Sequence, residues 1–517
     1  MGHSTLSRRG AVLAAIGLGA LVLMTPAFLI GHADVFPDTS AYELVGQWLM
    51  ERLGLDPRGG FAFMRHRADL GLFFTMAGAR SPYYSFLLFG VTNRGSAWAM
   101  AALQALAGSI LIALSVRVLI GELRLSLFLA VVGIMTLATS LPWFAILMMP
   151  DVFMGYLGLA AVLLVFYFDR LSIPERWGLG LGLGLALSFH ASNPPILMAV
   201  VAAALAGLAL RGVKARDTLP GIAICLVAAL AATLAFLAYP RLVQALAHRP
   251  LSRPPFLTAR LLADGPGRDY LTKACAQHEP LALCPDLGRP MTDANAILWS
   301  PSKTSGVYEP APYAVRLAMT RQEPAFVAAV FRLEPWRTTL DLLRDAWRET
   351  ADVTVIDTLG YRDFALTARG PGFSPPFPPL SVCVRRPNLC YPTAFQIDSQ
   401  YAIGATLALS AAYLVLRLVA GLAPFARRLA LKPLEGRDAT AAFAVLLLTL
   451  GNALFCGAVS GVFPRYQMRM AWIVPLWAIL AFLAAQGLPM RLRAISAWLL
   501  SFWRSPAIRR APPHHAS

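Results

Sequence analysis

The sequence predicts an all-α polytopic membrane protein of about ten transmembrane helices, with a mixed, disulfide-bearing extracytoplasmic domain. Of its 517 residues, 57% are hydrophobic and only 14% are charged, whereas soluble domains carry about 25% charged residues. The apolar residues fall in long runs, and a helix needs about 20 such residues to cross the hydrocarbon core. A helix also satisfies its own backbone polar groups in lipid.

Ten apolar ranges are the candidate membrane spans. The first follows Arg8 and Arg9 and is interpreted as an uncleaved anchor, with a signal peptide cleaved near Gly31 and Ala33 as the alternative. In either case the chain from residue 31 onward is expected outside. The ten ranges are 11–30, 96–118, 125–147, 152–168, 177–190, 195–210, 219–239, 399–420, 440–460 and 470–488.

The net charge of +17 lies beside the apolar runs and in one long polar insert, and no nucleic-acid-binding motif is present. We therefore expect membrane lipids, and no nucleic acid, as partners. Lys and Arg favour short cytoplasmic loops, and ten spans with both termini in the cytoplasm make every inner connection basic. We infer a multi-pass protein of the bacterial inner membrane. The inner residues are Arg117, Arg124, Arg170, Arg176, Arg211, Lys214, Arg216, Arg427, Arg428, Lys432, Arg437, Arg491 and Arg493.

Four regions follow from this topology. They are an N-terminal transmembrane module at 1–240 that includes a first outer loop at 31–95, an extracytoplasmic domain at 241–398, C-terminal transmembrane helices at 399–490, and a cytoplasmic amphipathic helix and tail at 491–517. Two further elements are expected within the extracytoplasmic domain. Residues 323–350 are predicted to be helical and divided by Pro335, and the proline-rich tract 371–380 is predicted to be an extended strap.

Four of the six cysteines lie in the polar insert, and an even number of cysteines in one outer region favours disulfides. The pairing with the shortest loops is Cys275–Cys284 and Cys383–Cys390. A zinc site is the alternative, although neither pair has the usual close spacing of zinc ligands. The other two cysteines, Cys225 and Cys456, lie within apolar runs and are predicted to be packing residues.

The first outer loop carries Asp34 and Asp38 just beyond the first span, and Arg80 near its end. A carboxylate at this position can act as a general base toward a hydroxyl acceptor. An arginine at the bilayer surface can bind a lipid phosphate. The alternative is a solvated loop in which these residues are merely polar.

Three further polar groups are expected on the outer side. Asp151 precedes the fourth span, where a carboxylate is costly unless it is paired or functional, or where it caps the helix. His190 and Asn193 lie in a turn. A lone histidine in such a turn is usually a hydrogen-bonded structural residue, and a catalytic role is the alternative. Arg465 and Arg469 are four residues apart on one helical face, which suits either a phosphate clamp or interfacial snorkelling.

Several common activities have no support. The chain has no Walker motif, no G-x-S-x-G and no H-E-x-x-H, so ATP hydrolysis and common hydrolase chemistry have no support. No metal-ligand motif is predicted, and the sequence does not decide whether a divalent metal participates. Alternate glycines at 178–184 mimic a nucleotide-binding loop but lie in an apolar run, where small residues mediate helix packing.

The outer-face residues resemble the motifs of polytopic glycosyltransferases of the C superfamily, in their order along the chain. This family includes protein mannosyltransferases and aminoarabinose transferases, which use polyprenyl-phosphate-linked sugars. The resemblance covers 1–210 and, more weakly, 440–488. Ser81 stands where the family has a proline, and Thr39 stands where it has a second acidic residue. The matching elements are Asp38 with Tyr42, Arg80-Ser81-Pro82-Tyr83-Tyr84, Pro150-Asp151, and Arg465-Tyr466 followed by Pro475.

The resemblance implies a membrane glycosyltransferase that moves a sugar from a polyprenyl-phosphate donor to an envelope glycan, lipid or protein. Asp38 is the implied base, with Asp34 as its rival and Asp151 in support. The insert would cover the cavity and select the acceptor. The implied substrate-binding residues are Tyr42, Arg80, Tyr83, His190, Asn193, Arg465, Tyr466 and Arg469.

The alternative is a non-catalytic membrane protein, such as a lipid or saccharide transporter or a structural subunit of a membrane complex. Transporters commonly show repeated halves and polar residues at mid-membrane depth. The sequence shows no convincing repeat, and its best polar candidates lie at the outer interface, which favours an interfacial enzyme.

The topology makes a direct prediction. Single cysteines introduced between residues 241 and 398 should react with a membrane-impermeant thiol reagent from the outside, because the insert is expected there. A cysteine at residue 430 should react only after the membrane is permeabilised. Labelling of both positions from the same side would contradict the ten-span topology.

Overall fold

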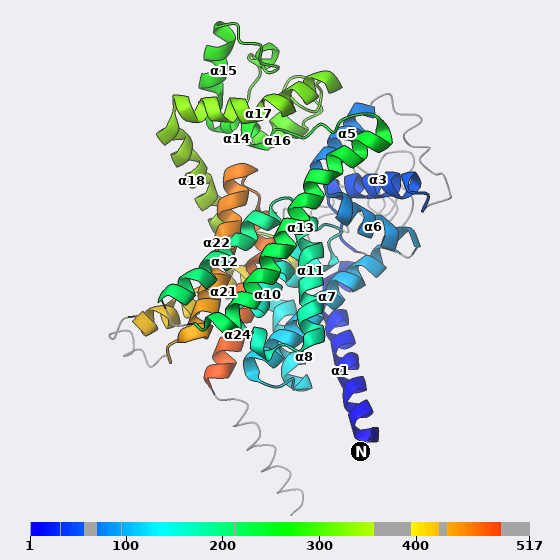
Figure 1. Ribbon diagram of the computed structural model, residues 1–517, viewed down its shortest axis with the longest axis vertical. Helices are drawn as coiled ribbons and strands as arrows, with labels where there is room; N and C mark the ends of the chain where they lie inside the picture. The colour runs from blue at the N-terminus through cyan, green and yellow to red at the C-terminus, as the bar shows by residue number, and fades with distance from the viewer. Residues whose placement is uncertain are drawn as a thin grey trace, which may run out of the picture.

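The computed structural model describes residues 2–30, 33–55, 70–94, 96–210, 213–355, 394–422 and 432–486. Within these residues every named element is a helix (Figure 1). The described part of the insert, residues 241–355, is therefore helical, and the expectation of a mixed domain is wrong for this part. The cause is the local sequence, which has helix starts at prolines and no alternating apolar pattern of a strand.

Within the described residues, a helix lies in each of the ten ranges that the hydropathy indicated, but the structure does not confirm ten membrane spans. Six helices among these residues are long and apolar enough to cross a membrane, at Ala97–Ile120, Asn193–Leu210, Ala215–Ala247, Asp398–Gly421, Gly436–Val459 and Pro464–Ala485. The bundle helices are α1 (Gly2–Leu23), α2 (Thr25–Ile30), α7 (Ala97–Ile120), α8 (Leu125–Ala138), α9 (Leu141–Ile146), α10 (Val152–Phe166), α11 (Ile173–Ser188), α12 (Asn193–Leu210), α13 (Ala215–Ala247), α21 (Ala394–Leu422), α22 (Gly436–Val459), α23 (Pro464–Ala471) and α24 (Ile473–Ala485).

Two of the predicted spans break four residues before a proline. The range 125–147 divides into α8 and α9, and α8 ends at Ala138, four residues before Pro142. The last span divides into α23 and α24, and α23 ends at Ala471, four residues before Pro475. A proline ring clashes with the carbonyl four residues earlier, so each break lies where the proline requires it. The last span also begins at Pro464 rather than 470, which places both arginines of the predicted clamp inside the helix.

The bundle is layered around α10. Every residue of α10 except Phe153 is buried, although the helix has only 15 residues. By contrast, α13 leaves a row of large apolar side chains exposed along its length. Such a surface is costly in water and is expected where a helix faces lipid. The row comprises Leu219, Leu226, Val227, Leu230, Leu234 and Leu237.

The first connection is itself largely helical. It contains α3 (Pro37–Arg52), α5 (Leu70–Ala79) and α6 (Pro82–Arg94). Helices α3 and α6 pack closely where a Cβ on Gly46 would lie only 2.1 Å from the Ser85 carbonyl oxygen. The rings of Tyr42 and Tyr84 meet edge to face nearby, at 5.1 Å between centroids. This packing brings the start of α3 toward the start of α6.

The insert has its own small core around helices α14 (Phe256–Asp264), α15 (Pro266–Ala276), α16 (Ala294–Trp299), α17 (Tyr313–Leu333) and α18 (Pro335–Ala351). Pro335 divides the two long helices, as the sequence predicts, although α17 begins ten residues before the predicted start. The insert lies at the end of the bundle opposite the N-terminus (Figure 1).

The disulfide Cys275–Cys284 is present and closes the turn after α15. Cys225 and Cys456 are buried free thiols, as the sequence predicts. Cys383 and Cys390, the tract 371–380 and the predicted amphipathic helix 491–503 lie outside the described residues.

The insert docks on the bundle mainly through α18 and α22. Gly457 permits this contact, because a Cβ there would lie 2.8 Å from the Asp345 carbonyl oxygen and 2.9 Å from the Ala346 Cα. At the same end of α18, the Glu349 carboxylate accepts a 2.7 Å hydrogen bond from the Phe463 N–H, just before α23. A second link joins Arg316 of α17 to the Thr75 hydroxyl of α5, at 3.0 Å. The insert is thus attached on both sides of the bundle end.

The close approach at Gly457 can be tested. Gly457→Ala should destabilise the docked insert by about 1–3 kcal/mol, because its methyl group meets backbone rather than a flexible side chain. Gly133→Ala, where nothing lies within 4 Å, should be neutral or slightly stabilising. Thermal unfolding of the two detergent-solubilised variants compares them, and equal unfolding temperatures would contradict the close contact.

Candidate functional site

Two loops are joined at the end of the bundle and together place the acidic residues. The Asp34 N–H donates to the Ile146 carbonyl, and the Met148 N–H donates to the Asp34 carbonyl, each at 2.9 Å. The Thr39 hydroxyl donates to the Met148 carbonyl at 3.1 Å. These bonds fix the start of α3 against the segment that leads to Asp151.

Asp38 and Arg80 form the tightest ion pair of the site. One amino group of the Arg80 guanidinium donates to Asp38 Oδ1 at 2.5 Å. The guanidinium also lies over the ring of Tyr42, at 5.9 Å, and over the ring of Trp299, at 5.3 Å. Since Trp299 ends α16, the insert contributes an aromatic wall to the site.

Arg465 lies between the two aspartates. Its NH1 is 3.9 Å from Asp38 Oδ2 and its Nε is 3.8 Å from Asp151 Oδ1. Both distances exceed a normal hydrogen bond, and among the described residues neither atom has a hydrogen-bond acceptor. The guanidinium packs against the rings of Phe36 and Tyr466, at 4.1 and 5.2 Å. Arg465 therefore holds two buried N–H groups with hydrogen-bonding capacity left.

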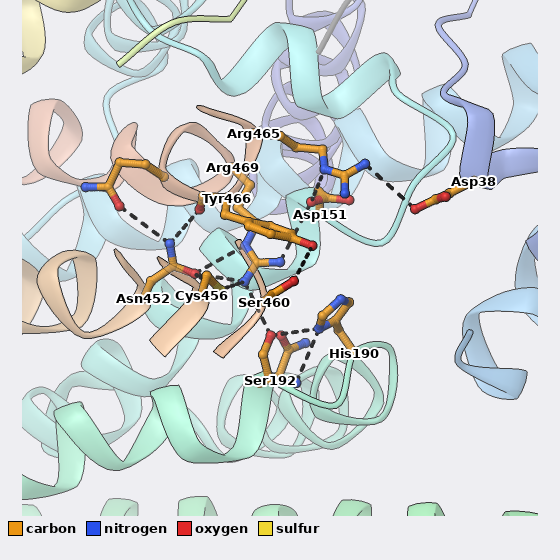
Figure 2. A network of polar contacts seen from close by, with 12 residues as sticks. Asp38, Asp151, His190, Ser192, Asn452, Cys456, Ser460, Arg465, Tyr466 and Arg469 are labelled. Atoms are coloured by element: carbon orange, nitrogen blue, oxygen red, sulfur yellow. Dashed lines mark hydrogen bonds and ion pairs between the residues drawn. The ribbon is translucent and has the colours of Figure 1, made fainter. Parts of the chain in front are cut away.

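Arg469 is held by several partners instead (Figure 2). Its NH2 donates to Asn452 Oδ1 at 2.8 Å, and it contacts Ser192 Oγ and Cys456 Sγ, each at 3.3 Å. Its NH1 is 3.7 Å from Asp151 Oδ1. Arg469 is fully buried, and this set of contacts makes it the anchor of Asp151 and of the neighbouring helix ends.

Asp151 has the position of a helix N-cap but not its function. It precedes α10, yet its side chain makes no capping hydrogen bond. The carboxylate instead faces Arg465 and Arg469. The expectation of a side-chain cap at this residue is wrong, because two guanidiniums compete for the carboxylate.

Asp34 lies apart from these arginines. It is 1% exposed, and its Oδ1 accepts a hydrogen bond from the Val35 N–H at 2.9 Å. Burial raises the pKa of its carboxyl from 3.8 to about 7, and the Val35 N–H opposes that shift. The Asp38 side chain, in contrast, is 24% exposed. Of the two candidates in the first connection, Asp38 is the one that is open to solvent.

The predicted turn at His190 has a defined hydrogen-bonding role. His190 Nδ1 lies 2.7 Å from Ser192 Oγ and accepts from the Ser192 N–H at 3.2 Å, so the proton of the neutral ring sits on Nε2. Burial, followed by the nearby charges of Arg469, Arg465 and Arg80, lowers the pKa of His190 well below its usual value.

Two of the predicted substrate-binding residues do not join the cluster. Asn193 donates to the Ala186 carbonyl at 2.7 Å, which closes the turn between α11 and α12. Tyr83 meets the ring of Phe236 edge to face at 6.2 Å, whereas the neighbouring Tyr84 is buried against Tyr42. Tyr466 joins the cluster through its ring, which lies under both Arg465 and Arg469.

The cluster of Asp38, Arg80, Asp151, Arg465 and Arg469, hereafter the charge cluster, contains three guanidiniums and two carboxylates. Its formal net charge is therefore +1. In the described part of the chain, no group of three or more His, Cys, Asp or Glu side chains could hold a metal ion. The arrangement suits a singly charged anion with oxygen acceptors.

Sequence reasoning missed three contributors to this site. Asn452 lies in the middle of an apolar helix, and a polar side chain there is a recognisable signal. Ser192 belongs to the turn that was singled out, but its contact with Arg469 joins residues 277 positions apart. Trp299 lies in the insert, and no sequence pattern indicated its place in the site. Its contact with Arg80 depends on how the insert docks on the bundle.

The contrast between the two arginines of α23 leads to a stability prediction. Arg469→Met should destabilise the protein by about 3–5 kcal/mol, since removing one partner leaves a buried charge uncompensated. Arg465→Met should cost less, because Arg465 is 11% exposed and has fewer close partners. Thermal unfolding of both variants in detergent measures the order, and a larger loss for Arg465→Met would contradict it.

In comparisons with protein-family models, curated proteins and solved structures, nothing matches this chain.

Proposed function

We propose that the protein is a membrane glycosyltransferase that moves a hexose or pentose from a polyprenyl-phosphate donor to an extracytoplasmic acceptor, which is an envelope glycan, lipid or protein. In this proposal the charge cluster faces outward from the bacterial inner membrane and both termini are cytoplasmic. The observation that carries the proposal is the meeting of Asp38, Arg80 and Arg465 at one end of the bundle. These residues come from three separate segments of the chain.

The donor phosphate fits the net charge of the cluster. A sugar-phosphate-polyprenyl diester carries one negative charge, which matches the single net positive charge of the cluster. Arg465 has two buried N–H groups without hydrogen-bond acceptors among the described residues, and a guanidinium pairs well with phosphate oxygens. Arg465 is therefore the proposed primary phosphate ligand, and Arg80 is the second.

Asp38 is the proposed base. Its carboxylate accepts the proton of the acceptor hydroxyl as the acceptor oxygen bonds to the anomeric carbon of the sugar. The bond between that carbon and the phosphate oxygen breaks, and its electron pair leaves on the polyprenyl phosphate. Arg465 and Arg80 stabilise the negative charge that develops on the leaving oxygen. Asp151, held by Arg469, keeps Arg465 oriented.

The decisive experiment compares aspartate variants in proteoliposomes supplied with labelled polyprenyl-phosphate hexoses and pentoses. Asp38→Asn should reduce transfer by about 10²–10⁴-fold, the usual range for loss of a general base. Asp34→Asn is the matched control. It should retain wild-type transfer, since Asp34 lies apart from the arginines and the amide oxygen can still accept the Val35 N–H.

Arg465→Ala should behave differently from Asp38→Asn, because it removes a phosphate ligand. Binding of the labelled donor should weaken in Arg465→Ala and remain in Asp38→Asn. Full transfer by Asp38→Asn together with loss in Asp34→Asn would make Asp34 the base. Full transfer by the Asn variants of Asp34, Asp38 and Asp151 would instead favour the non-catalytic alternative.

A further inference from the structure

Helix α18 of the insert carries an exposed apolar stripe. Four large apolar side chains recur along it at intervals of four, three and four residues, which places them on one helical face. All four are more than half exposed to solvent. They are Trp336 (81%), Leu340 (63%), Leu343 (53%) and Trp347 (69%).

The opposite face of α18 is polar and buried. Thr338, Asp345 and Glu349 are each 0% exposed. Asp345 pairs with Arg260 of α14, and Glu349 accepts the Phe463 N–H. A surface helix in water buries its apolar face and exposes its polar face. Helix α18 shows the reverse arrangement.

The position of α18 relates the stripe to the lipid-facing surface. Its buried face packs on Gly457 of α22. Leu454 and Leu450 lie three and seven residues earlier on the same face of α22, and both are 39% exposed. Helix α18 therefore covers the last turns of a face that continues as exposed leucines. After α18, Val355 is buried in the bundle core, so the C-terminal end of α18 lies at the end of the bundle.

A basic edge borders the stripe. Arg337, Arg344 and Arg348 lie about a quarter-turn from it at intervals of seven and four residues, as the 3.6-residue repeat requires. Their side chains are 50–61% exposed. Arg344 pairs with Asp341 and Arg348 pairs with Asp345, and both of these carboxylates are largely buried. Arg337 pairs with Asp269 and Glu334. The outward surface of α18 therefore presents tryptophan and leucine beside guanidinium groups.

From this arrangement we propose that the exposed stripe of α18 binds the surface of the lipid bilayer in which the bundle is embedded. Tryptophan and arginine are suited to this boundary, because the ring or the stem lies in the acyl region and the polar end stays in the headgroups. The continuity with Leu450 and Leu454 favours lipid over a protein partner. The inference does not depend on the proposed transfer reaction.

The geometry also predicts a depth gradient. Trp347 lies two residues before Glu349, which contacts the start of α23. Trp336 lies 11 residues farther from that end, roughly 16 Å along the helix axis. Trp347 should therefore sit deeper in the bilayer than Trp336.

The first test uses photo-crosslinking of the full-length protein in native membranes. The photoreactive residue p-benzoylphenylalanine replaces Leu340 or Leu343, and in the control it replaces Lys303, which is exposed in a loop of the insert. After irradiation, the intact mass should increase by that of one phospholipid at Leu340 and Leu343, and not at Lys303. Crosslinks to a second copy, to another protein or to another segment of this chain, or no adduct at all, would overturn the proposal.

The second test measures depth in nanodiscs of brominated phosphatidylcholine, with and without phosphatidylglycerol. Bromine quenches nearby tryptophan fluorescence, so Trp347→Phe should remove a larger part of the quenched signal than Trp336→Phe. Trp177→Phe, at an exposed position of α11, provides a bundle reference. If neither Trp336→Phe nor Trp347→Phe changes the quenched fraction, the stripe does not contact lipid.

Discussion

The pairing of Asp38 and Asp151 with three guanidiniums is the interaction on which the end of the bundle depends. A carboxylate at the edge of a membrane bundle is costly unless it is paired. The guanidiniums come from the bend between α5 and α6, where Arg80 lies, and from α23. Arg469 of α23 is in turn anchored by α22 and by the turn before α12. The hydrophobic effect contributes little to packing between helices in lipid. The need to pair these carboxylates therefore fixes the relative positions of segments that apolar packing alone would not fix.

The charge cluster also explains the irregular helices. The proline break between α8 and α9 leaves the segment at 146–148 free to bond with Asp34, and that contact sets the path to Asp151. The break before Pro475 turns α23 into a short helix that carries both arginines.

Much of the fold could be predicted from hydropathy, because lipid imposes a minimum length and an internal hydrogen-bonding pattern on each segment. The breaks were harder to place, although each follows from the steric rule for proline. The identity of the charged residues was visible from their order, but not their pairing. Arg469 anchors the neighbouring helix ends, whereas Arg465 keeps N–H groups without acceptors. This difference depends on Asn452 and Ser192, which contact Arg469 but are distant from it in sequence. The insert contacts had no sequence signal at all.

The burial of α10 on all sides limits which substitutions this sequence can accept during evolution. A helix that faces neighbours around its whole circumference offers no tolerant side, so substitutions there must conserve volume. Helix α13, with its exposed row of leucines, can exchange one aliphatic residue for another with little effect. Sequences descended from this chain should therefore diverge quickly along α13 and retain the residue sizes of α10.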